Sequence, residues 1–189
     1  MTVSRCHWAE TSDAQMQAYH DHEWGVPQHD ERALFEMLTL EGAQAGLSWR
    51  TVLVRREAYR QAYHSFDIER VAAMTDAELS GLMTDSALIR NRLKICSVRD
   101  NARAALAAIK QYGSLDHYLW SFVGHTPVRN NRADRSQVPA TTPTSDAMSK
   151  ALKKAGFRFV GSTICYAFMQ ATGMVNDHLT GCFRHEEVQ

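Results

Sequence analysis

The sequence predicts an all-α protein, and three features of the chain support that prediction. Apolar residues recur at the spacings of three and four that place side chains on one face of a helix. Residues that favour helix starts precede these segments, and glycines follow several of them. No run shows the alternation of apolar and polar residues that is typical of a strand.

Seven of the nine predicted helices begin at a side chain that can accept a hydrogen bond from the free N–H groups of the first turn. Thr75 and Glu78 also have the spacing of a capping box. The predicted capping residues are Ser12 or Asp13, Asp30, Ser48, Asp67, Thr75, Ser114, and Thr144 or Ser145. The expected helices cover 13–24, 31–45, 49–64, 67–74, a short stretch from 76, 90–110, 115–123, 145–155 and 162–172.

The segment 124–143 interrupts this helical pattern. It holds three of the four prolines and almost no apolar residues. Connections of about 20 residues without regular structure are uncommon in compact domains, and they are usually functional or mobile. We therefore expect a long loop here.

The composition limits the class of protein. At 189 residues, with 44% hydrophobic and 22% charged residues, the chain can bury a core as one globular unit. No apolar run reaches membrane-spanning length, and the first residues lack the apolar stretch of a secretory signal. We expect a cytoplasmic protein, in which the four cysteines are free thiols or metal ligands rather than disulfides.

The formal net charge is zero, which argues weakly against a nucleic-acid partner. The distribution is uneven, because residues 1–50 hold eight acids and three bases, which leaves 18 bases and 13 acids for the rest. Such bunching permits a phosphate-binding face, although a solvated helix surface explains it equally well. The basic clusters are Arg90, Arg92, Lys94, Arg99 and Arg103; Arg129, Arg132 and Arg135; and Lys150, Lys153, Lys154 and Arg158.

One carboxylate falls on the apolar face of the helix predicted at 31–45. Helical spacing places Glu41 on the same face as Leu34 and Leu38, so it should point inward. A buried carboxylate needs a donor or a shifted pKa. Trp49 follows closely, so the pair suits a pocket for a flat, polar or cationic ring. From this stretch alone, a buried ion pair between Glu41 and an arginine is the favoured interpretation.

Cysteine and histidine residues gather near the two ends of the chain. Cys6 and His20 lie near the start, whereas His178 and Cys182 lie four apart near the end. Two cysteines and two histidines can close a tetrahedral zinc site that has no position for a substrate. The spacing is not that of a zinc finger, so from the residues alone chance is the better explanation. Competing ligands are His7, His22 and His185.

Two further patterns suggest a binding site. Residues 156–163 form an apolar and glycine-containing turn that leads into a helix, as in the second half of a helix-hairpin-helix. Backbone N–H groups at such a turn can hold a DNA phosphate. Three of the four tryptophans also lie within the first 50 residues. An ordinary helical turn and an ordinary aromatic core are the alternatives.

Several long motifs together carry a family resemblance. They are RCHW (5–8), YHDHEWGVP (19–27), LFEMLTLEGAQAGLSW (34–49), RNRLKI (90–95), WSFV (120–123), SDAMSKALKKAGFRFVGSTICYAFMQATGMVNDH (145–178) and Gly181-Cys182. With these segments the chain resembles the bacterial DNA-3-methyladenine glycosylase I family, within the helix-hairpin-helix glycosylase superfamily. The resemblance covers nearly the whole chain.

The resemblance implies a fold and a partner. It implies one unit over 1–189 with the helix-hairpin-helix DNA glycosylase fold, a helical body at 30–173, a hairpin at 156–163, and termini joined by one structural zinc. It also implies a monomer that acts on double-stranded DNA containing alkylated adenine, in the bacterial cytoplasm and at the nucleoid.

The resemblance further implies hydrolytic excision of 3-methyladenine, which leaves an abasic site. The base-recognition and catalytic carboxylate falls on Glu41. The other implied site residues are the zinc ligands Cys6, His20, His178 and Cys182; the pocket aromatics Tyr19 and Trp49, with Trp8 and Trp24 nearby; the plug residues Gly46 and Leu47; and the DNA-contacting residues Gly161, Ser162 and Lys154.

These residue types suit such chemistry. The target nucleotide must leave the duplex, at a cost of roughly a few kcal/mol. The methylated base is cationic, so an indole face and a carboxylate both attract it more than neutral adenine. Asp177 is expected to serve the metal site or a helix end rather than catalysis. The alternatives are a non-catalytic binder of alkylated DNA and a zinc-stabilised helical module that binds a protein.

Overall fold

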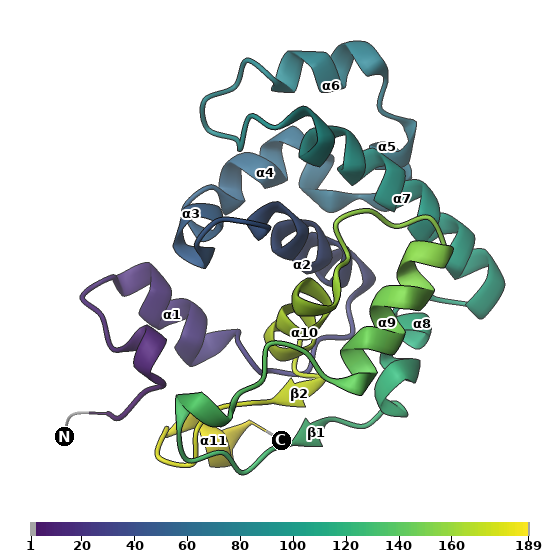
Figure 1. The fold of residues 1–189 in the computed structure, drawn as a ribbon. Helices are drawn as coiled ribbons and strands as arrows, with labels where there is room; N and C mark the ends of the chain where they lie inside the picture. Colours follow the sequence, from purple (N-terminus) through teal and green to yellow (C-terminus); the bar gives the residue numbers. More distant parts are fainter. Residues whose placement is uncertain (1–2, 189) are drawn as a thin grey trace.

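The structure, a computed structural model, describes residues 3–188 and is mostly helical, as predicted (Figure 1). The first two residues and the last residue of the predicted 1–189 unit lie outside this range. The helices are α1 (Ala14–His22), α2 (Glu31–Gln44), α3 (Trp49–Leu53), α4 (Arg56–Ala62), α5 (Ile68–Ala73), α6 (Asp76–Leu82), α7 (Arg92–Tyr112), α8 (Leu115–Trp120), α9 (Pro143–Lys154), α10 (Ser162–Ala171) and α11 (Arg184–Glu187).

Most predicted helix starts are confirmed. The side chains of Asp13 and Asp30 accept hydrogen bonds from the first turns of α1 and α2, and the capping box at Thr75 is formed. The predicted cap of α9 at Thr144 or Ser145 is wrong. Thr142 caps this helix instead, because Pro143 fits its first position.

The single helix predicted over 49–64 is also wrong. The chain forms α3 and α4, with a break at Val54 and Arg55. The guanidinium of Arg55 donates to the carbonyl oxygen of Thr51 at 2.8 Å, so this side chain occupies an acceptor that a continuous helix would use. The break leaves Val54 exposed while Tyr59 is buried in the core.

Helix α2 lies at the centre of the molecule, surrounded by α3, α7, α8 and α10 (Figure 1). Its residues from Leu34 to Ala43 are all buried. A side chain at Gly42 would lie only 3.2 Å from the Cβ of Phe159, in the turn between α9 and α10. The absence of a side chain at Gly42 therefore lets this turn pack directly on α2.

The segment 124–143 has more structure than expected. Its strand β1 (Val128–Arg129) pairs in parallel with β2 (Val175–Asn176), so the prediction that the chain has no strands is wrong. Two paired residues are too few to produce an alternating sequence pattern. The loop is thereby attached to the C-terminal segment, which also contacts the N-terminal segment through Phe183 N–H and Ser4 O at 3.0 Å.

Within residues 3–188, no helix combines the length and the hydropathy that crossing a membrane requires.

Candidate functional site

A cavity of about 630 Å³ opens between the N-terminal segment, the end of α2, α3, α10 and the 124–143 loop. All five aromatic and acidic residues predicted for a pocket line it: Trp8, Tyr19, Trp24, Glu41 and Trp49. These side chains come from four separate parts of the chain, so only folding brings them together.

Glu41 points inward from α2, as its helical spacing predicts, and is only 4% exposed. The favoured interpretation, an ion pair with an arginine, is wrong. Arg56 and Arg60 instead bind Glu36 on α2, whereas the Oε2 atom of Glu41 has no hydrogen-bond partner among the described residues. Burial raises the pKa of Glu41 to about 8. The cavity therefore holds a carboxyl group that lacks a donor.

Trp49 is the first residue of α3 and lines the same cavity. Its indole Nε1 is buried and has no acceptor among residues 3–188. The Tyr19 ring lies 5.1 Å from the Trp49 ring, and the Trp8 and Trp24 rings lie 5.2 Å apart. Burial, followed by the charge of Glu41, raises the pKa of Tyr19, so its hydroxyl stays protonated. The cavity wall therefore presents aromatic rings together with polar atoms that have no partner among the described residues.

The turn between α2 and α3 carries the predicted plug residues at the edge of the cavity. Gly46 has a φ of +76°, which disfavours other residues, and Leu47 is 41% exposed. The buried ammonium of Lys94 on α7 donates to the carbonyl oxygens of Ala43 at 2.8 Å and Ala45 at 2.7 Å. Lys94 therefore holds the end of α2 and is not part of a phosphate-binding surface.

The turn between α9 and α10 carries the other predicted DNA contacts. Gly161 is the N-cap of α10 and provides no side chain to its first turn, so N–H groups there are free. The hydroxyl of Ser162 is hydrogen-bonded to the hydroxyl of Ser145, at 2.9 Å, and donates to the carboxylate of Asp146. Lys154 is exposed at the end of α9. The backbone of Ser162, rather than its hydroxyl, is available to an anion.

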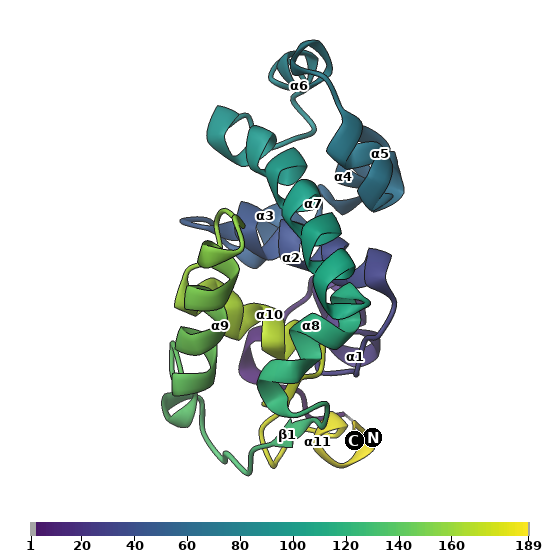
Figure 2. The ribbon, with the colours of Figure 1, turned by 90° about the vertical axis from the view of Figure 1, so that its right-hand side faces the viewer.

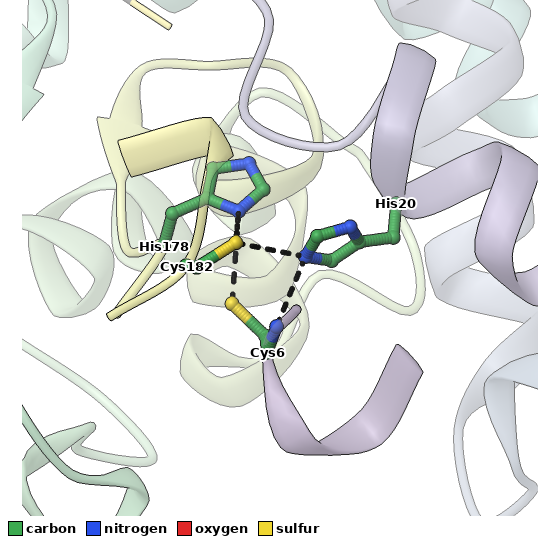
Figure 3. Close-up of side chains that lie close together, drawn as sticks. All are labelled: Cys6, His20, His178 and Cys182. Carbon is green, nitrogen blue, oxygen red and sulfur yellow. Dashed lines mark hydrogen bonds between the residues drawn. The ribbon is translucent and has the colours of Figure 1, made fainter. Parts of the chain in front are cut away.

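Cys6, His20, His178 and Cys182 converge at a buried point where the N- and C-terminal segments meet (Figure 3). Their ligand atoms all lie within 4.8 Å of one another. The Sγ of Cys182 is 3.5 Å from both His20 Nε2 and His178 Nδ1. Hydrogen-bonding interactions with Cys6, then with His178 and His20, lower the pKa of Cys182.

This geometry fits a tetrahedral metal ion, since nitrogen and sulfur ligands of zinc lie about 3.6 Å apart. The remaining ring nitrogens are also fixed. His20 Nδ1 is 2.8 Å from Asp21, and His178 Nε2 is 2.9 Å from the carbonyl oxygen of Trp24. Such partners orient histidine ligands in metal sites. The group can hold a metal ion, and the competing His7, His22 and His185 are not part of it.

The expectation that Asp177 serves the metal site or a helix end is wrong. Its buried carboxylate lies in the cavity wall, where Oδ2 accepts from Arg132 at 2.8 Å, from Tyr166 at 2.5 Å and from Gln170 at 2.7 Å. Asn130 donates to Oδ1 at 2.7 Å. Asp177 therefore attaches the 124–143 loop to α10.

Other polar residues that line the cavity were not predicted from the sequence, among them Gln44, Gln170 and Arg135. Gln44 lies one helical turn after Glu41, a spacing that could have identified it. Gln170 and Arg135 lie far from Glu41 in sequence and reach the same cavity only through the fold. The long loop thus contributes to the site through Arg135.

Residues 8–185 match the family model described as methyladenine glycosylase. The chain belongs to the methyladenine glycosylase family.

Relatives of this methyladenine glycosylase chain match over nearly their whole length. DNA-3-methyladenine glycosylase 1 of Escherichia coli is 51% identical over 95% of this chain and 96% of its own. The DNA-3-methyladenine glycosylase of Haemophilus influenzae is 48% identical over 95% and 97%. The Staphylococcus aureus 3-methyladenine DNA glycosylase I, solved to describe 3-methyladenine recognition, superposes with a TM-score of 0.90 at 37% identity, covering 92% of both chains.

Proposed function

We propose that this protein hydrolyses the N-glycosidic bond of 3-methyladenine in alkylated double-stranded DNA. The observation that carries the proposal is a pair of buried polar atoms, Glu41 Oε2 and Trp49 Nε1, that have no partner among residues 3–188 and lie at an aromatic cavity. A ligand must supply a donor to the first and an acceptor to the second. An adenine ring offers both, in its amino group and its ring nitrogens.

Charge explains the preference for the methylated base. N3-methylated adenine carries a positive charge in DNA, so it favours the ionised form of Glu41 that burial otherwise disfavours. A cation also gains roughly 0.5–2 kcal/mol on the face of an indole, here that of Trp49. Neutral adenine gains little binding energy from the Glu41 carboxylate or from the Trp49 indole. Tyr19, Trp8 and Trp24 complete the cage around the base.

Access to the base requires flipping the nucleotide out of the duplex. Leu47, exposed at the turn that Gly46 permits, fills the space that the base leaves. The free N–H groups at Gly161 and Ser162, with the ammonium of Lys154, hold a phosphate beside it. This assignment makes α9 and α10 a helix-hairpin-helix.

The reaction itself needs little proton transfer. The bond between C1′ and the base nitrogen breaks, and its electron pair neutralises the cationic base. A water oxygen then bonds to C1′ and its proton passes to solvent, so the enzyme is monofunctional and leaves an abasic site. Glu41 contacts the reacting base and is therefore the catalytic residue that we assign.

We assign zinc as a structural ion to Cys6, His20, His178 and Cys182, because two thiolates and two imidazoles suit zinc in tetrahedral geometry. Bound zinc would supply a link between the terminal segments and no chemistry at the base. Within the described chain, His20 directly follows the cavity residue Tyr19 on α1, so the cluster orients this wall of the cavity.

Release of free 3-methyladenine from methylated duplex DNA tests the function. Glu41→Gln should lower the rate of release roughly 10–100-fold, the worth of a charge-assisted hydrogen bond, with a smaller loss of DNA affinity. Glu57→Gln, at an exposed carboxylate on α4, is the matched control. DNA binding without release of the base would favour a non-catalytic binder of alkylated DNA. A DNA affinity that does not fall as the salt concentration rises would favour a protein-binding module.

A further inference from the structure

The start of α7 exposes an apolar side chain next to positive charges. Leu93 is 72% exposed, the highest value among the exposed large hydrophobic residues of the described chain. Arg90 and Arg92 precede it in the chain and are exposed, and neither forms a salt bridge with any residue of 3–188. By contrast, Arg99 and Arg103 further along α7 donate to the carbonyl oxygens of Met74 and Ala72.

This exposed tip of α7, residues 90–93, lies next to the turn between α2 and α3 that carries the proposed plug residues. The bond from Lys94 to Ala45 O, 2.7 Å long, joins the residue after Leu93 to the residue before Gly46. Figure 2 shows the start of α7, the turn between α2 and α3 and the turn between α9 and α10 along one side of the molecule. The tip is therefore continuous with the proposed DNA-binding surface.

We propose that residues 90–93 are a second DNA-contacting element. Arg90 and Arg92 bind phosphates of the duplex beside the flipped nucleotide, and Leu93 packs against its sugars and base edges. The inference rests on the proposed function, since it takes duplex DNA as the occupant. Two unpaired guanidinium groups complement phosphates, while an exposed leucine gains only if a partner covers it.

A single isolated leucine on a surface needs no explanation. Three observations distinguish Leu93: the two preceding arginines form no salt bridge with any residue of 3–188, the position adjoins the plug turn, and Lys94 fixes the distance between Leu93 and that turn. Binding that covers both Leu47 and Leu93 would hold the duplex at two points on rigidly connected elements.

The test measures affinity for a duplex carrying a stable abasic-site analogue across a range of salt concentrations. Arg90→Ala and Arg92→Ala should each reduce the slope of log affinity against log salt by about one. Leu93→Ser should weaken binding about tenfold, whereas Leu93→Met should not, because methionine covers a similar apolar area. Lys110→Ala, at the other end of α7, is the control and should match the wild type.

Affinity for free 3-methyladenine, followed by tryptophan fluorescence, should stay unchanged in all of these variants. The proposal is overturned if the arginine variants keep the wild-type slope or if Leu93→Ser keeps the wild-type affinity. A wild-type protein that binds DNA but releases no base would contradict the proposed function, while the comparison of slopes would still decide this inference.

Discussion

Arg132 donates a hydrogen bond to the buried carboxylate of Asp177 across 2.8 Å, and this ion pair joins the 124–143 loop to the cavity wall. Arg132→Ala would leave Asp177 buried without its cation. We expect the free energy of unfolding to fall by roughly 2–4 kcal/mol in denaturant titrations. Arg129→Ala removes an exposed ion pair with Glu186, so the free energy of unfolding should fall by less than about 1 kcal/mol. Equal losses in both variants would contradict this account.

The link between Lys94 and Ala45 should matter for DNA more than for the base. Lys94→Met leaves two carbonyl oxygens without their donor, so the turn that carries Leu47 loses its fixed position. We expect affinity for abasic-site DNA to fall roughly tenfold, with a smaller change in affinity for free 3-methyladenine. Lys94→Arg should recover part of the loss. If Lys94 acts through the turn, its effect should shrink in a Leu47→Ala background, and additive effects would refute this coupling.

The pKa of Glu41, about 8, predicts a pH dependence of excision. The ionised form complements the cationic base, so kcat/KM for release from methylated DNA should rise with pH and level off above about 8. Glu41→Gln should have lower activity and lack this rise. A rising limb that persists in Glu41→Gln would assign the titration to another group.

The same shift predicts a pH dependence of stability. Because the pKa of Glu41 is higher in the folded than in the unfolded protein, its stabilising protonation is present below the unfolded value of 4.5 and is lost as pH rises through 8. The Tm of Glu41→Gln relative to wild type should therefore increase over that interval and then stay constant. A difference independent of pH would show that Glu41 is not the group responsible.

The cysteine and histidine cluster should bind one equivalent of zinc. Cys182→Ser should lower zinc content and Tm together, because it removes a ligand from the closed set. Asp21→Asn should retain the ligands but lower zinc affinity roughly 10–100-fold, as removal of a histidine's outer partner does. Cys96→Ser, whose thiol lies outside the cluster, should keep both zinc and Tm. Undiminished zinc in Cys182→Ser would remove that residue from the site.

Local patterns in the sequence were sufficient for much of the fold. Asp30, Thr75 and the spacing of Leu34 and Leu38 act within one or two helical turns, so their roles follow from neighbouring residues. The inward direction of Glu41 followed in the same way. That Glu41 Oε2 has no donor among residues 3–188 did not follow, because Arg56 and Arg60 bind Glu36, a pairing that only tertiary packing decides.

Long-range relations escaped prediction. The two residues of β1 pair with β2 across more than forty positions, and Asp177 finds donors on α10 and on the loop. Lys94 was grouped with surface charges because its neighbours in sequence are exposed, although its ammonium is buried. Whether a charged side chain faces solvent depends on the other elements that pack against its helix. The sequence of that helix alone does not identify those elements.

The cluster of Cys6, His20, His178 and Cys182 also sets an order in time. Its first ligand, Cys6, leaves the ribosome long before its last one, Cys182. During synthesis, the wall that carries Tyr19 therefore lacks its final anchor until Cys182 has been added. A chain that stops before Cys182 would lose this anchor, so Tyr19 would not be held in its place in the cavity.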